Sequence, residues 1–252
     1  MRQTTLLTEL RAKGIHAVEA IFIPQLSHLK QLLLSKNPAE VRLGWEALYS
    51  AWGFGYLPVE EPAFDAKRIN KESKCGRRAL YIPHQLAKPS NLLAWNQVPQ
   101  FSRCYLGFGS EIENRPFEGW QFVECSLEPP HPYGFDPIDE QQKLKSADGM
   151  TINAYLAFIG WCLAVYSRKT PDPYHYSCGK GGPAVLLAGS TKSSKPCYVK
   201  WETICVGSDG KPTSTPPYFL FSKNPDPYCD TMHFGFRSGI SAKSVCRDTK
   251  DT

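Results

Sequence analysis

The apolar positions over residues 4–52 follow a helical pattern. Apolar residues recur three or four positions apart in three runs, at 6–10, 26–33 and 41–52. Asn37 before Pro38 is typical of a helix start, because Asn caps the first turn and proline fits the first helical position. Gly53 and Gly55 end the third run. We therefore predict a helical subdomain over residues 1–55.

The chain changes character after residue 55. Residues 56–78 are rich in proline and charge, and we interpret them as a loop or linker. Short apolar runs then predict strands at 79–82, 101–108, 120–127, 184–188, 197–206, 217–222 and 231–236. A polar turn separates the second and third runs and predicts a hairpin between them.

One long apolar stretch interrupts the strand pattern. Met150 to Tyr166 contains no charged residue, and Thr151 fits the cap of a helix over 151–166. A span of this length is at the lower limit for crossing a bilayer, so we interpret it as a buried central helix and expect no membrane partner. The expected fold is α+β, with an N-terminal helical segment followed by a mostly antiparallel sheet packed on the central apolar helix. We assign 79–240 to this domain and 241–252 to a mobile tail.

Charge and cysteine content bear on the environment of the protein. The net charge of +5 arises within residues 167–252, which hold 12 basic and 7 acidic residues. Thr8 and Glu9 interrupt the apolar run that a signal peptide needs, and the chain contains no Asn-x-Ser/Thr acceptor site. The nine cysteines include no C-x-x-C pair. We therefore expect a soluble cytoplasmic protein with reduced, mostly buried cysteines.

A short motif, Pro-x-Pro-Tyr, occurs three times, at 130–133, 171–174 and 225–228. Two prolines in three residues stiffen the backbone, so each copy predicts a rigid loop at a sheet edge. Polar residues of binding chemistry lie in or just after these loops. The candidate ligand-binding residues are Tyr133, Tyr174, Tyr228 and His131, and the candidate metal ligands are His175, Cys178, Cys229 and His233.

Three functions are compatible with these residues. The first is a non-enzymatic binding or accessory protein that holds a small molecule or protein in a pocket formed by the C-terminal loops. The second is a zinc protein or Cys/His enzyme, because His-x-x-Cys and Cys-x-x-x-His spacings place two ligands on one ion. The third is a single-stranded nucleic-acid binder, because aromatic and lysine residues alternate in the last third. No P-loop, dinucleotide fingerprint or nucleophile elbow is present, so the sequence leaves open whether the chain is an enzyme.

Overall fold

The computed structural model of the protein describes residues 27–54, 57–97, 112–114, 118–127, 149–166, 184–193, 195–200, 203–206, 212–214, 218–221, 234–236 and 239–242. After a helical stretch at 27–33, the helices are α3 (Pro38–Ala51), α4 (Ala66–Lys74), α5 (His84–Ala87), the 3-10 helix η1 (Pro89–Gln97) and α7 (Ile152–Val165). The strands are β1 (Arg77–Ile82), β2 (Glu113–Asn114), β3 (Gly119–Glu124), β4 (Ala184–Lys192), β5 (Lys195–Lys200), β6 (Thr203–Val206), β7 (Pro212–Ser214), β8 (Tyr218–Phe221), β9 (Phe234–Phe236) and β10 (Gly239–Ser241). The α+β fold is therefore confirmed.

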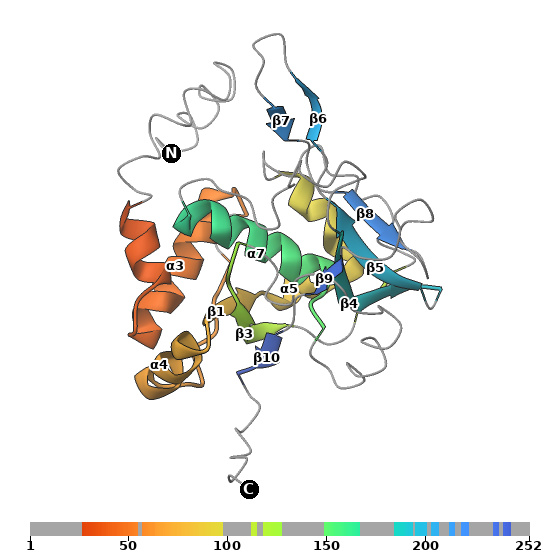
Figure 1. Ribbon diagram of the computed structural model, residues 1–252. Helices are drawn as coiled ribbons and strands as arrows, with labels where there is room; N and C mark the ends of the chain where they lie inside the picture. The colour runs from red at the N-terminus through yellow and green to blue at the C-terminus, as the bar shows by residue number, and fades with distance from the viewer. Residues whose placement is uncertain are drawn as a thin grey trace, which may run out of the picture.

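The strands form two sheets and a two-stranded ribbon instead of the single predicted sheet. The first sheet has the order β1-β3-β10, and the second has the order β2-β4-β5-β8 with β9 beside β4. Strands β6 and β7 pair only with each other among the described residues. Every described pairing is antiparallel except that of β4 with β9, so the predicted antiparallel character is confirmed. Figure 1 shows α7 between the N-terminal helices and the β4–β5 sheet.

Helix α7 is the buried centre that the sequence predicts. The Thr151 side chain accepts a hydrogen bond from the Ala154 amide, and every residue of the helix except Leu163 is buried. Apolar residues surround the helix on all sides because β1, β4 and the end of α3 pack against it. Among the described residues, the structure contains no helix with the length and apolar character needed to cross a membrane.

Helix α3 covers the open edge of the first sheet. The Trp45 indole N–H donates to the carbonyl of Ala79 at 3.1 Å, and the Tyr49 hydroxyl donates to the carbonyl of Tyr81 at 2.7 Å. Trp45 and Tyr49 are four residues apart, which is a rise of about 6 Å along the helix. Their acceptors are two residues apart, which is about 6.7 Å along the strand, so the two donors match alternate carbonyls of β1. The helix therefore satisfies an edge that would otherwise present unpaired carbonyls.

The loop predicted over 56–78 is wrong for its second half, which forms α4 and the first residues of β1. Asp65 caps α4 by accepting from the Arg68 amide at 2.8 Å. Only Ile69 and Glu72 of the helix are buried. A single buried apolar residue produces no hydrophobic period, so the pattern gave no sign of this helix.

Three further differences concern strands. The predicted strand 197–206 is divided between β5 and β6. The predicted hairpin partner 101–108 lies outside the described residues, and β3 already pairs with β1 on one edge and β10 on the other. The predicted tail begins too early, since Ser241 belongs to β10 and the Ala242 amide donates to the Trp120 carbonyl at 3.0 Å.

Candidate functional site

The residues predicted to bind a ligand or metal all fall outside the described part of the chain. These are Tyr133, Tyr174, Tyr228, His131, His175, Cys178, Cys229 and His233. The structure does describe the strands into which their segments lead. The structure therefore shows where those strands begin.

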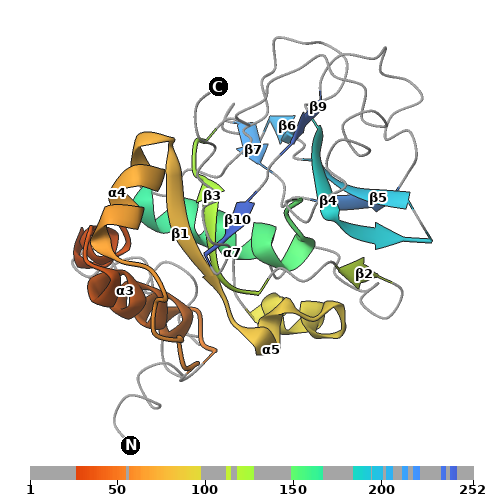
Figure 2. The same ribbon diagram turned by 90° about the horizontal axis from the view of Figure 1, so that it is seen from below.

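Two of the three Pro-x-Pro-Tyr segments lead into strands that lie side by side. Strand β4 follows the segment at 171–178, and β9 follows the segment at 225–233. The two strands are parallel, with Ala184 opposite Phe234 and Leu186 opposite Phe236. Because parallel strands start at the same end of a sheet, the chain enters both strands at one place. Figure 2 shows β9 next to β4 at this end.

The third segment joins the described chain elsewhere. The segment 130–133 begins three positions after Leu127, which follows β3 of the first sheet, and it is much farther along the chain from Gly149, the next described residue. The starts of β4 and β9 thus lie at one end of the second sheet, and the convergence of the three Pro-x-Pro-Tyr segments stays a prediction.

The sheet behind this end is tightly packed. Cys197 and Tyr198 of β5 are fully buried, and Phe219 of β8 is 5% exposed. Burial raises the pKa of the Cys197 thiol well above its ordinary value, so this cysteine is an inert part of the core. Tyr198 and Phe219 are among the aromatic residues of the last third that suggested a single-stranded nucleic-acid binder. Their burial removes them from any surface on which bases could stack.

The N-terminus of α7 is joined to the second sheet by a buried polar network. The Asn114 amide group donates to the Asn153 side-chain oxygen at 2.8 Å, and the Ser190 hydroxyl donates to the Asn114 oxygen at 2.5 Å. Ser190 also accepts from the Ile152 amide at 2.9 Å. These groups are bonded to one another, so they fix β4 against α7 instead of presenting free groups to a ligand.

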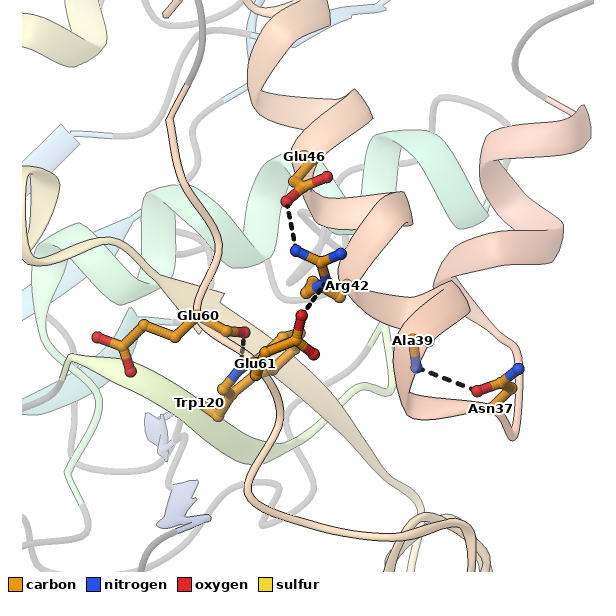
Figure 3. Close-up of polar contacts among 7 residues, drawn as sticks. All are labelled: Asn37, Ala39, Arg42, Glu46, Glu60, Glu61 and Trp120. Carbon is orange, nitrogen blue, oxygen red and sulfur yellow. Dashed lines mark hydrogen bonds and ion pairs between the residues drawn. The ribbon is translucent and has the colours of Figure 1, made fainter.

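A second polar cluster, at the start of β3, was missed by the sequence reasoning. His84 Nδ1 lies 2.5 Å from the Glu118 carboxylate. Tyr81 and Trp120 are paired across β1 and β3, with ring centroids 5.0 Å apart. The Trp120 indole donates to the Glu60 carbonyl at 2.9 Å, while the Glu60 carboxylate points away from the α3 side chains (Figure 3).

Electrostatics in this cluster favour a neutral tyrosine. Burial raises the pKa of Tyr81; a backbone hydrogen bond with Glu60 lowers it, and the carboxylates of Glu60 and Glu118 raise it. Gly119 lies near the Glu60 carboxylate: its φ of +70° suits glycine, and an added Cβ would lie 3.8 Å from Glu60 Oε2. The cluster therefore lies at the surface and contains one buried residue with a hydroxyl, Tyr81.

The chemistry available to the cluster is limited by its exposure. A carboxylate on Nδ1 is typical of an acid–base histidine, but the His84 and Glu118 side chains are 60% and 45% exposed. Solvent screening holds such a pair to about 0–1 kcal/mol. Within the described residues, no three His, Cys, Asp or Glu side chains are grouped to hold a metal ion. We interpret the His84–Glu118 contact as a surface hydrogen bond. Sequence gave no signal for it because the partners are 34 positions apart.

Four cysteines whose side chains the structure describes are thiols. Cys75 is exposed at the C-terminus of α4, whereas Cys125, Cys162 and Cys197 are buried. The expectation of reduced, mostly buried cysteines holds for these four. No family model matches the chain, and no curated protein sequence or solved structure is detectably similar to it.

Proposed function

We propose that the protein is a ligand-binding module whose ligand is held by the segments 171–178 and 225–233. The observation that supports this is the parallel pairing of β4 and β9, with Ala184 opposite Phe234. Binding residues are commonly carried by loops on a rigid scaffold, and the buried sheet behind these strand starts supplies one.

The reach of the chain makes a shared site geometrically accessible. Cys178 precedes Ala184 by six positions, Cys229 precedes Phe234 by five, and His233 directly precedes Phe234. An extended chain spans at most about 3.5 Å per residue, so these side chains are confined to within about 20 Å of the common strand end. With His175, they form a Cys2His2 set of the kind that binds tetrahedral zinc. This donor chemistry makes Zn²⁺ the first ligand to test.

The metal form of the proposal is tested by zinc analysis of the full-length chain, purified without chelators. We expect about one zinc per chain, lost in Cys178→Ser and in Cys229→Ser, because each removes one of four ligands. Cys75→Ser is the matched control, since Cys75 is exposed on α4, away from β4 and β9 (Figure 1). Absence of zinc, or equal loss in the control, would contradict the metal form.

A pocket that binds an organic ligand without metal has a separate readout. Tyrosines 133, 174 and 228 would then supply its walls, and His131 a polar group. Screening of aromatic fragments by NMR should shift the backbone amides of Val185 and Gly235, which are partners in the β4–β9 pair. If neither zinc nor any fragment affects these amides, the site is not at this end of the sheet and the proposal is wrong.

A further inference from the structure

Helix α4 presents one strongly basic face to solvent. Lys67, Lys71 and Lys74 are exposed, and their spacing of four and three residues places them within about 60° of one another around the helix axis. The three charges extend over about 10 Å of helix at about 1.5 Å per residue. Lys67 and Lys74 form no ion pair within the part of the chain that the structure describes.

The acidic residue of this helix does not neutralise that face. Glu72 is 3% exposed and lies on the inner side with Ile69. Its carboxylate pairs with Arg68 at 2.8 Å and with Arg77 at 3.2 Å. Arg68 also lies over the Phe122 ring at 5.6 Å. This one inner carboxylate is shared by two arginines, so it does not offset the charge of the exposed lysines.

We propose that this lysine face is a docking surface for the phosphate backbone of double-stranded nucleic acid. Lysines that follow one another along a surface replace the counterions of a polyanion, and the released ions drive binding. The proposal is independent of the site at β4 and β9, because α4 packs on β1 of the first sheet, apart from β4 and β9 of the second sheet (Figure 2). Its three lysines lie outside residues 167–252, where the net positive charge of the sequence is found.

The composition of the face favours a duplex over the other polyanions. Helices that bind anionic membranes insert an apolar side into the lipid, and the apolar side chain Ile69 is buried against the protein. Single strands are held mainly by stacking on aromatic side chains, and α4 contains none. A duplex offers regularly spaced phosphates that lysines bind without reading sequence.

The test is fluorescence anisotropy of the full chain with a labelled duplex of arbitrary sequence at rising salt. Three phosphate contacts predict a slope of log K against log salt near about −2.7, which is an affinity loss of about forty-fold between about 50 and 200 mM salt. The triple variant Lys67→Gln, Lys71→Gln, Lys74→Gln should lose most of the binding and flatten this slope.

A matched control separates the face from net charge alone. Lys30→Gln, Lys36→Gln, Lys88→Gln removes the same charge from exposed positions elsewhere and should leave the slope unchanged. Circular dichroism confirms that both variants are folded, since lysines near a helix C-terminus also stabilise the helix. Equal loss in the two triple variants, no binding of the parent chain, or stronger binding to phosphatidylserine vesicles or single strands than to the duplex would each overturn the proposal.

Discussion

Replacement of Gly160 by alanine tests the packing of the central helix most sharply. An added Cβ at this position of α7 would lie 1.7 Å from Trp52 Cζ2 and 1.8 Å from Cη2. Carbon atoms in contact are about 3.5–4.0 Å apart, so the indole would have to move by about 2 Å. The indole has little room to move, because its ring packs edge-on against the Tyr49 ring, with centroids 5.5 Å apart, and at a tilt against the Trp95 ring, with centroids 6.1 Å apart.

The expected effect on stability is the difference of two terms. Overpacking costs about 1–3 kcal/mol, and occasionally more, while alanine gains about 1 kcal/mol over glycine in a helix interior. Because contacts of 1.7 and 1.8 Å are a severe clash, we take the upper end of the overpacking cost and expect Gly160→Ala to lower the free energy of unfolding by about 2 kcal/mol, with a fall in Tm of roughly 4–8 °C. Urea unfolding followed by circular dichroism measures this, and the m-value should not change.

A double-mutant cycle supplies the control. In a Trp52→Leu background the clashing ring is gone, so Gly160→Ala should become neutral or stabilise the fold by up to about 1 kcal/mol. The reasoning is refuted if Gly160→Ala is neutral in the parent chain, or if it destabilises both backgrounds equally.

Three other perturbations have defined outcomes. Burial raises the pKa of Tyr49, so the fold favours the neutral phenol, and the free energy of unfolding should be full below about pH 10 and fall above it. Tyr49→Phe should lower the free energy of unfolding by about 1 kcal/mol at neutral pH but show a shallower decline at alkaline pH in urea titrations. An unchanged alkaline decline would contradict this assignment. Asn153→Ala breaks the network at the N-terminus of α7 and should cost about 2–3 kcal/mol of unfolding free energy, whereas a loss below about 0.5 kcal/mol would show that water replaces the bonds. A maleimide reagent should label Cys75 in the native protein while the described buried cysteines react only on unfolding, as mass spectrometry of peptides would show; native labelling of the buried cysteines would disprove the packing around them.

Local signals predicted the elements that carry their information within a few residues. Asn37 caps α3, and Thr151 caps α7 as expected, because a side-chain acceptor next to an apolar period identifies a helix start without knowledge of the rest of the fold. The uncharged stretch of α7 also predicted its burial correctly. Strand existence was predicted for β1, β3, β4, β5, β8 and β9, although boundaries differed by a few residues.

Features that depend on distant partners were not predicted. Helix α4 is held by Ile69 and by the pairing of Glu72 with Arg68 and Arg77, which leaves no apolar period to detect. The parallel pairing of β4 with β9 joins segments about fifty residues apart, and nothing in either strand specifies it. The His84–Glu118 pair requires the register of β1 and β3, which the sequence does not reveal.

The most direct test of the account is the orientation of β9 beside β4, because the proposed binding site rests on their common start. Backbone nuclear Overhauser effects in isotopically labelled protein report which residues face each other across the pair. The account predicts contacts of Ala184 with the neighbourhood of Phe234, and of Leu186 with the neighbourhood of Phe236. The reverse pattern, with Ala184 beside Phe236, or contacts of this edge of β4 with a different strand, would contradict it.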